Sequence, residues 1–454
     1  MMKGFKKSPL GLKTDTFVRK YDAFQFADRL KKNGAFPVEY VNNCDLSDGN
    51  AHAGIGVTDY VLPSGRSVAY DWSLSAPKAF FFCGGKLGFL SDKNKLYFYN
   101  ESTRSYDLAH TFNGEMKVVQ AQDDAGTYHL YFCGEAGLFT CADDQEMVQI
   151  SAHAYFPAAC VFQGRIFTAV ADSIVYGAPF SLGDVSESMD GGGKIVLPFD
   201  SGNIVDIVAS SECVFVFCQY GVWKLSVAGS ARDFRLERVP FHGNEILKGS
   251  ACVVAYSGGE KILFFDKYGP WKLDRSGVSE ICRDVRYSPR TNDQSCEHAY
   301  VNGKVVYNYR TVVGWVYNVV IDAETDSAYP SFTAEGLCNL KGQAVAVVDG
   351  TLKALQIDSP LPSHRLSELV ARECDFNVSG VKTLRRLRVL GEGTITLSVS
   401  GAGKVQTFSL HMQDGEARVD VRLKSEFFRL RFTLGERAIV RGLDVQLCQL
   451  KGVQ

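Results

Sequence analysis

The sequence lacks the short motifs that mark common enzyme chemistry. It has no G-x-S-x-G nucleophile elbow, no H-E-x-x-H zinc motif, no Walker loop and no dinucleotide fingerprint. Sialidase-type Asp boxes (Ser-x-Asp-x-Gly-x-Thr-Trp) are also absent, and the eight histidines show no metal-ligand spacing. We therefore predict no catalytic residue, no metal site and no cofactor, and we expect a protein that is not an enzyme.

Long apolar runs are missing as well. No stretch approaches the roughly 18 apolar residues that span a bilayer, so we expect no membrane partner. The basic opening MMKGFKKSPLGLKTDTFVRK is followed by no apolar run, so no Sec-type signal is predicted. With 454 residues, 46% of them hydrophobic and 22% charged, the composition is that of a globular protein. We expect it to be soluble and made in the cytosol.

Thirteen cysteines are present, but none forms a C-x-x-C pair or clusters with histidine. Many lie inside apolar runs such as FFFCGG and VFVFCQ. This placement predicts reduced cysteines that act as small core hydrophobes.

Charge is distributed unevenly along the chain. Residues 1–33 carry a net +6 and residues 361–454 a net +5, whereas residues 34–360 carry a net −13. An acidic body with basic ends is not the usual footprint of a nucleic-acid-binding domain, which concentrates Lys and Arg on the main domain.

An internal repeat is the clearest positive feature. YGVWKL at Tyr220–Leu225 recurs as YGPWKL at Tyr268–Leu273, and each copy follows an apolar run typical of a strand. Similar strand–turn–strand units recur every 36 to 48 residues, with turn pairs such as Gly84–Gly85, Asn302–Gly303 and Asp349–Gly350. The mean spacing of about 43 residues is that of a four-stranded propeller blade. The pattern predicts an all-β fold with a β-propeller of six to eight blades.

The pattern changes at both ends. After Pro360–Pro362, five or more strands follow in about 80 residues, with strict alternation in FFRLRFTL. This predicts a C-terminal antiparallel β-sandwich over 361–454, after a propeller over 61–360. Residues 1–60 are expected to form a basic arm, one short helix around Asp22–Lys32 and a strand that closes the propeller ring.

Several local patterns have a structural explanation that we favour over a chemical one. Asp45–Gly49 and Asp322–Asp326 loosely resemble calcium loops but lack the full ligand series, so we predict solvated turns. Trp223, Trp271 and Trp315 could stack on sugars, yet their place in the repeat favours packing of one blade on the next.

Two basic clusters are candidates for contacts with DNA or with another subunit. One is in the N-terminal segment and the other lies on the outward faces of the C-terminal strands. Their members are Lys3, Lys6, Lys7, Lys13, Arg385, Arg386, Arg388, Arg429 and Arg431. The arginines fit a solvated sheet face and an inter-subunit surface equally well.

The whole arrangement resembles the tail nozzle proteins of bacteriophages, also called tail tubular protein B, and related propeller-bearing head–tail proteins. The resemblance lies in the basic opening MMKGFKKSP, the Asn-Cys-Asp…Asp-Gly…Gly-x-Gly stretch from Asn43 to Gly56, blades without WD or kelch signatures, and the terminal LRRLRVLGEGTITLSVS. The chain departs from the family in being short and in having HAGIGV where an Arg usually precedes the Gly.

The resemblance implies a structural protein of the virion, assembled in the host cytoplasm. It implies a ring of copies of itself, as a hexamer, which contacts neighbouring virion proteins and lets duplex DNA pass without sequence specificity along an acidic wall. Two alternatives stay open from the residues alone. One is a carbohydrate-binding or glycan-cleaving propeller, and the other is an intracellular propeller scaffold that binds peptides.

Overall fold

The fold is described from a computed structural model of the chain. Nearly all regular structure among the described residues is β-strand, and a short 3-10 turn, η2, spans Phe199–Ser201. No helix in this part of the chain is long and apolar enough to cross a membrane. The structure describes residues 14–26, 35–46, 48–71, 73–122, 128–141, 146–180, 191–230, 233–282, 296–310, 316–332, 334–356, 367–412 and 414–450.

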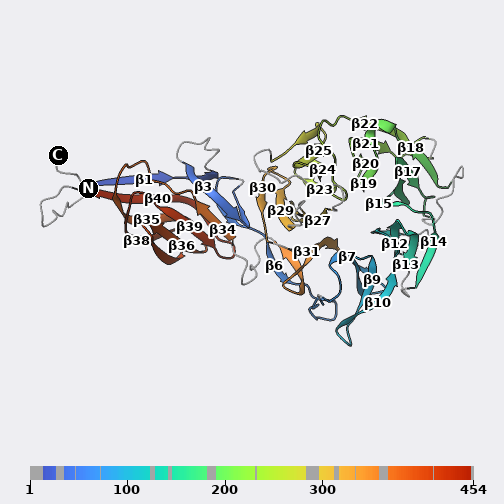
Figure 1. The fold of residues 1–454 in the computed structure, drawn as a ribbon, viewed down its shortest axis with the longest axis horizontal. Coiled ribbons are helices and arrows are strands. Elements are labelled where there is room, and N and C mark those ends of the chain that lie inside the picture. Colours follow the sequence, from blue (N-terminus) through green and yellow to red (C-terminus); the bar gives the residue numbers. More distant parts are fainter. Residues whose placement is uncertain are drawn as a thin grey trace. The chain divides into compact units, whose positions relative to one another are not determined.

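The middle of the chain forms seven four-stranded antiparallel sheets, arranged around a common centre (Figure 1). They are the blades of a β-propeller, which confirms the predicted fold class and falls within the predicted range of blades. In blades 1 to 6 the strands follow one another in sequence order, and the first strand of each lies innermost.

The first four blades span residues 77 to 239. Blade 1 is β7 (Pro77–Cys83), β8 (Lys86–Ser91), β9 (Lys95–Asn100) and β10 (Ser105–Thr111). Blade 2 is β11 (Met116–Gln122), β12 (Tyr128–Gly134), β13 (Gly137–Cys141) and β14 (Met147–Ser151). Blade 3 is β15 (Phe156–Phe162), β16 (Arg165–Val170), β17 (Ser173–Tyr176) and β18 (Gly193–Val196). Blade 4 is β19 (Ile204–Ala209), β20 (Val214–Cys218), β21 (Gly221–Ser226) and β22 (Arg235–Val239).

The last three blades complete the ring. Blade 5 is β23 (Cys252–Tyr256), β24 (Gly259–Phe265), β25 (Pro270–Asp274) and β26 (Gly277–Glu280). Blade 6 is β27 (Glu297–Val301), β28 (Lys304–Arg310), β29 (Val316–Asp322) and β30 (Ala328–Pro330). Blade 7 is β31 (Glu335–Leu340), β32 (Gln343–Val348), β33 (Thr351–Gln356) and, as its outermost strand, β6 (Gly56–Asp59). A strand from the N-terminal segment thus closes the propeller, as the sequence predicts.

Turn chemistry explains several of the hairpins. Asn302 and Gly303 both adopt positive φ, at 43° and 84°, and Asp349 and Gly350 do so at 54° and 76°. A two-residue hairpin of type I′ needs positive φ at both central residues, which Asn-Gly and Asp-Gly tolerate. The turn pairs chosen from the sequence therefore do connect adjacent strands of blades.

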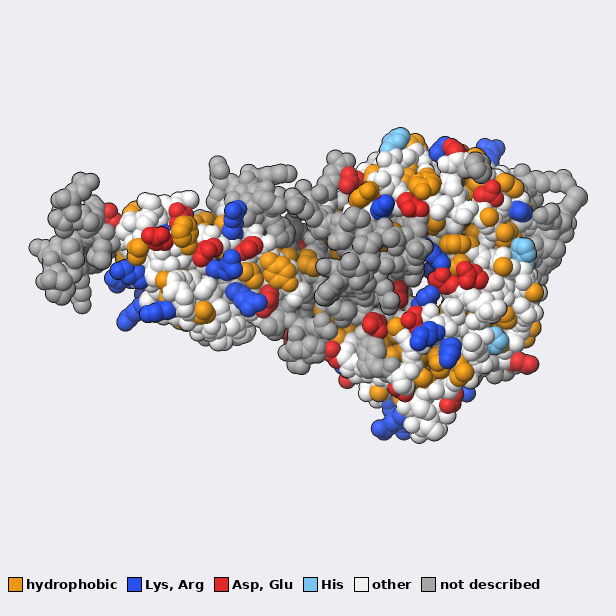
Figure 2. All heavy atoms as spheres, viewed as in Figure 1, with side chains coloured by type: hydrophobic (Ala, Val, Ile, Leu, Met, Phe, Trp, Pro, Cys, Tyr) orange, Lys and Arg blue, Asp and Glu red, His pale blue; other side chains and the backbone are white. Residues whose placement is uncertain are grey.

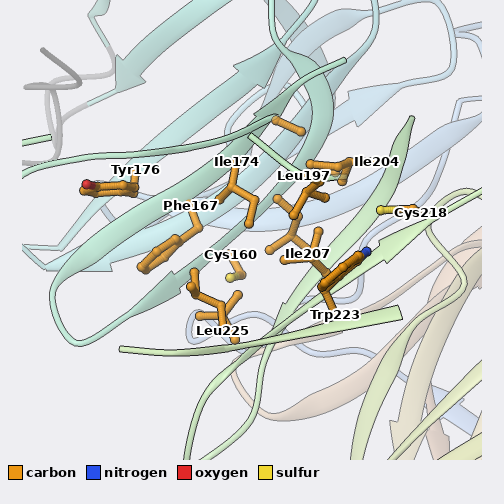
Figure 3. Packing of buried hydrophobic residues seen from close by; sticks show 14 of the residues in the cluster. Cys160, Phe167, Ile174, Tyr176, Leu197, Ile204, Ile207, Cys218, Trp223 and Leu225 are labelled. Carbon is orange, nitrogen blue, oxygen red and sulfur yellow. The ribbon is translucent and has the colours of Figure 1, made fainter. Parts of the chain in front are cut away.

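Apolar side chains between successive blades hold the propeller together. The cluster between blades 3 and 4 contains Phe167, Ile174, Ile207 and Trp223 (Figure 3). Trp223 is 7% exposed, and its indole Nε1 donates to Ser201 Oγ at 3.0 Å. A corresponding cluster packs blade 7 against blade 1, so the last and first blades of the ring are also held together.

The two repeated tryptophans occupy equivalent third strands, β21 and β25. Trp271 packs edge-on against Phe241 between blades 4 and 5, with ring centroids 5.1 Å apart. Packing of one blade on the next is thus confirmed for Trp223 and Trp271, whereas Trp315 lies outside the described residues.

All thirteen cysteines are thiols rather than disulfides, and nine of them are buried. Burial raises the pKa of the Cys133 thiol to about 12, so it stays protonated near neutral pH. The predicted role as small core hydrophobes is confirmed for the buried ones.

A second compact unit contains residues from both ends of the chain, together with residues 329–332. Its first sheet has the order β38 (Glu416–Ser425), β35 (Lys382–Glu392), β40 (Ile439–Leu450), β5 (Ala51–Ala53) and β4 (Cys44–Asp45), with β1 (Thr14–Tyr21) also paired to β40. Its second sheet has the order β2 (Ala23–Phe26), β3 (Ala35–Asn42), β34 (Ser367–Ala371), β39 (Arg429–Leu434), β36 (Thr394–Gly401) and β37 (Lys404–His411).

This unit differs from the expected, purely C-terminal domain because strands of the N-terminal segment complete both sheets. Strand β1 pairs antiparallel with β40 over eight residues, which supplies β40 with backbone partners along Leu443–Leu450. The predicted alternation is confirmed in β39 and the residue before it: Phe428, Leu430, Phe432 and Leu434 are buried, while Arg429 and Arg431 are exposed.

The helix expected around Asp22–Lys32 is wrong over its first part, where Ala23–Phe26 is strand β2. Phe24 is buried, and its ring contacts those of Phe36 and Phe432 at 6.0 Å in T-shaped geometry. These aromatic contacts favour a strand beside β3 over the local helical pattern. Residues 27–32 lie outside the described part of the chain.

The stretch from Asn43 to Gly56 is organised by one buried asparagine. Asn43 is 1% exposed with φ of 45°, and its side chain donates to Ile55 O at 3.0 Å and accepts from Ser331 Oγ at 3.0 Å. Gly54 donates its N–H to Asn43 O at 2.9 Å. A Cβ at position 54 would lie 2.5 Å from that carbonyl oxygen, so glycine is required there.

We predict that Trp223→Ala lowers the free energy of unfolding by about 3–5 kcal/mol, because it leaves a cavity between two blades. The matched control is Tyr220→Ala in the same repeat, whose side chain is 54% exposed and whose loss should cost less than about 0.5 kcal/mol. Urea unfolding of both variants checks this. Equal losses would contradict the assignment of Trp223 to the inter-blade core.

We also predict that Gly54→Ala lowers the free energy of unfolding by roughly 1–3 kcal/mol, since the added methyl group meets a backbone carbonyl that cannot move aside. Ser64→Ala, in an exposed turn, is the control and should be near neutral. A Gly54→Ala protein as stable as the wild type in urea would show that the contact with Asn43 relaxes freely.

Candidate functional site

The basic residues singled out in the sequence separate into two groups. Lys3, Lys6, Lys7 and Lys13 lie outside the described residues, so their contact role stays a prediction. Arg385, Arg386, Arg388, Arg429 and Arg431 lie in β35 and β39, on separate sheets of the second unit.

A β-bulge in β35 places its arginines outward. The register shifts between Leu384 and Arg386 on both neighbouring strands: Arg385 is the extra residue against β40, whereas against β38 the extra residue lies on β38. As a result Arg385 and Arg386 are both exposed while Leu384 and Leu387 are both buried.

Most of these arginines bind carboxylates on adjacent strands. Arg386 Nε donates to Asp420 Oδ1 at 2.6 Å, and Arg388 binds Glu416 and, at 3.2 Å, Asp444. The hydrogen bond from Arg388 lowers the pKa of the Glu416 carboxyl.

The two arginines of β39 are also paired, Arg431 with the adjacent strand β34 and Arg429 with β3, the next strand but one. Arg429 lies 3.1 Å from Glu39 and Arg431 2.9 Å from Glu368. The outward faces are therefore lattices of alternating charge, and Arg385 alone of the five predicted arginines has no ion pair within the described ranges. Such exposed pairs contribute little stability each, but they leave less free positive charge for a polyanion.

The two calcium-like stretches form turns. Asp48 accepts hydrogen bonds from the backbone and side chain of Asn50, and Asp322 Oδ1 accepts from the backbone N–H groups of Glu324 and Thr325. Asp322 Oδ2 binds Lys304 at 2.5 Å. Asp48 lies in an exposed turn as predicted, but Asp45 is buried in β4 and Asp322 ends β29 largely buried, so the prediction of solvated turns is wrong for these two residues.

A cavity of about 440 Å³ at the centre of the propeller is the site that sequence reasoning missed. It is lined by the first strands of blades 1, 2, 6 and 7 and by residues that precede β23 in blade 5. Figure 2 shows charged side chains of both signs around the hollow at the propeller centre. The charged and titratable lining residues are Lys78, Glu115, Lys117, Lys248, Glu297, His298 and Lys341.

The sequence does contain a signal for this site. Lys78, Lys117 and His298 are each the second residue of the first strand in their blades, β7, β11 and β27. Aligning the blades at that strand would have brought the three positions together, because first strands line the centre of a propeller.

Glu115 binds two of the lysines. Its Oε1 lies 2.8 Å from Lys78 Nζ, and its Oε2 accepts from Lys248. Burial alone would raise the pKa of Glu115, but the two ammonium groups outweigh it and hold that pKa below its usual range. Lys248 also lies over the Phe156 ring, 4.7 Å from its centroid. Glu115 is therefore an ionised structural partner.

His298 is the histidine of the cavity. Burial, together with the positive charge of Lys117, lowers the pKa of His298 to about 3, so the imidazole is neutral at pH 7. One ring N–H donates to the Gly249 carbonyl, and the buried Nδ1 has no hydrogen-bond partner in the part of the chain described. A neutral imidazole nitrogen of this kind can accept a hydrogen bond.

Asp206 is a buried acidic residue of β19. The positive charges of Lys117 and Lys248 act to lower the pKa of its carboxyl group. Its oxygens accept from the backbone N–H groups of Ala251 and Ile207, both at 3.0 Å. Burial raises the pKa of Asp206 despite these donors. The bond to Ala251 ties blade 4 to blade 5.

Comparisons with known proteins give likenesses of fold only. No family model and no curated protein matches the chain. Solved structures that resemble it include a catalytically inactive virginiamycin B lyase from Staphylococcus aureus with quinupristin, at 11% identity, covering 64% of this chain and 98% of that one, with a TM-score of 0.40. BamB from Moraxella catarrhalis has 11% identity, covers 70% of this chain and 96% of that one, with a TM-score of 0.39.

We predict that Glu115→Gln removes a pH-dependent part of the stability. Because the folded pKa of Glu115 is lowered from 4.5, its ion pairs stabilise the fold above that value and are lost as pH falls through the lowered pKa. The variant should lose about 1–2 kcal/mol at pH 7 and progressively less towards pH 3. Urea unfolding across that range checks this, with exposed Glu212→Gln as control. A difference that is constant with pH would contradict it.

Proposed function

We propose that the protein is a structural, non-enzymatic component of a bacteriophage virion that forms part of the tail or head–tail channel. In this proposal copies of the chain assemble in the host cytoplasm into a nozzle-like ring, a hexamer, through contacts between proteins. Neighbouring virion proteins are its further partners, and duplex DNA passes through the ring without sequence-specific contacts.

The observation that carries the proposal is that strands from the N-terminal segment complete sheets formed by later parts of the chain. Strand β6 completes blade 7, and β1 pairs over eight residues with C-terminal β40. Outer-strand closure of this kind prevents a propeller from opening at one blade, and pairing of the two ends prevents fraying. These features suit a rigid building block that carries load in an assembly.

The bonding of the cavity carboxylates favours a non-catalytic role over glycan cleavage. Glycoside hydrolysis uses two carboxyl groups, one of which donates a proton and therefore needs a raised pKa. Glu115 is bound by two lysines with a lowered pKa, and Glu297 Oε2 accepts from Asn308 Nδ2 and the Leu337 N–H, both at 3.3 Å.

The charge pattern supports passage of DNA rather than tight binding. The net −13 of residues 34–360 repels phosphate groups, and four of the five candidate arginines are paired with carboxylates. The basic segment that holds Lys3, Lys6, Lys7 and Lys13 is then left as the part suited to dock on an acidic neighbouring subunit.

We predict that light scattering on a sizing column detects a species near six protomers of 50.0 kDa each. In 1 M salt, where the Debye length is about 3 Å, this species should dissociate if the basic segment joins the subunits. The matched variant replaces Lys3, Lys6, Lys7 and Lys13 with Ser and should be monomeric at low salt. A wild-type monomer at every protein concentration and salt would contradict the self-assembling ring.

A further inference from the structure

The lysines that line the central cavity outnumber its glutamates, so not every ammonium group has a carboxylate partner. Glu115 binds Lys78 and Lys248, and Lys341 lies over the Phe82 ring at 4.0 Å from its centroid. Lys117 has no ion pair or hydrogen bond among the described residues; its influence on Asp206 and His298 is electrostatic only. One ammonium group in the cavity is thus available to an anion.

A second feature points to a ligand independently. The buried Nδ1 of His298, which lines the same cavity, is an acceptor without a donor among the described residues. A buried polar atom without a partner costs free energy comparable to a lost hydrogen bond, so it calls for a hydroxyl or N–H group from outside the chain. A simple anion such as acetate could pair with Lys117, but it has no donor for Nδ1 of His298.

The size of the cavity limits the ligand. About 440 Å³ is too small for a nucleic acid duplex or a protein segment of several residues, and it lies in the range of small-molecule sites. Its remaining walls include apolar side chains of β7 and β31, such as Phe80 and Leu337. The cavity therefore suits one compact molecule that has a polar side and an apolar side, which is typical of a sugar ring.

We propose that the central cavity binds a small hydroxylated anion, whose negative group contacts Lys117 and whose hydroxyl donates to Nδ1 of His298. The shared chemistry covers a sugar acid and a phosphate that carries an O–H group. The site does not depend on the virion role and would serve a propeller in any assembly.

Isothermal titration calorimetry of the whole chain at pH 7 tests this with four probes: glucuronate, glucose, acetate and inorganic phosphate. Glucuronate has both groups, glucose lacks the charge and acetate lacks the hydroxyl. We expect glucuronate to bind at least about tenfold more tightly than glucose and acetate. Phosphate as the tightest probe would support the same chemistry with a phosphate source. Glucose that binds as tightly as glucuronate, or no binding by any probe, would overturn the proposal.

Variants assign the two contacts. Lys117→Met should weaken glucuronate binding about tenfold, to the level of glucose, whereas Lys93→Met, which makes the same change on an exposed turn, should leave it unchanged. His298→Phe should abolish the preference for glucuronate over acetate. Glucuronate affinity unaffected by both cavity variants would overturn the site. The wild-type probe series decides the matter without them if either variant fails to fold.

Discussion

Closure of the propeller ring is the constraint on which the rest of the structure depends. A blade buries both faces only when a neighbour lies on each side, so blade 7 must be complete for blade 1 to pack on it. Its outer strand comes from β6, almost 300 residues before β33, and the entropy of closing so long a loop must be offset by contacts. Tyr60 N–H donates to Leu352 O at 3.1 Å, Tyr70 N–H donates to Gly350 O at 2.7 Å, and Lys353 binds Asp59. The segment that follows β6 therefore strengthens the closure.

The glycine-marked stretch between β3 and β6 is held by the hydrogen bonds of one buried residue. Asn43 satisfies four backbone or hydroxyl partners while almost fully buried, which leaves no space for a side chain at Gly54. Buried polar groups cost free energy unless every hydrogen bond is made, and here they are made within the described chain. A motif first noticed for its resemblance to a family thus has a local physical reason: it fixes the direction in which the chain leaves β3.

The repeat, the turn pairs and the alternation in β39 could be predicted because each depends on residues close in sequence. Period-2 burial and Asn-Gly or Asp-Gly turns are local rules. The pairing of β1 with β40 depends on partners more than 400 residues away, which no local pattern reveals. The strand at Ala23–Phe26 pairs with β3 nearby but also packs on Phe432, a contact that the local helical pattern does not show. The cavity was missed for the same reason. Lys78, Lys117 and His298 become neighbours only when three blades meet at the centre.

The charged lining of the cavity is costly for a building block that needs only rigidity. Removing ammonium groups from water carries a penalty that ion pairs often fail to recover, and well-packed apolar residues commonly stabilise such a position more. The pairs of Glu115 offset this cost for Lys78 and Lys248, but no such pair offsets it for Lys117 within the described residues. Stability alone would favour a side chain at position 298 whose polar atoms all have hydrogen-bond partners. Binding of a hydroxylated anion would give Lys117 a counter-charge and Nδ1 of His298 a hydrogen-bond donor at the same time.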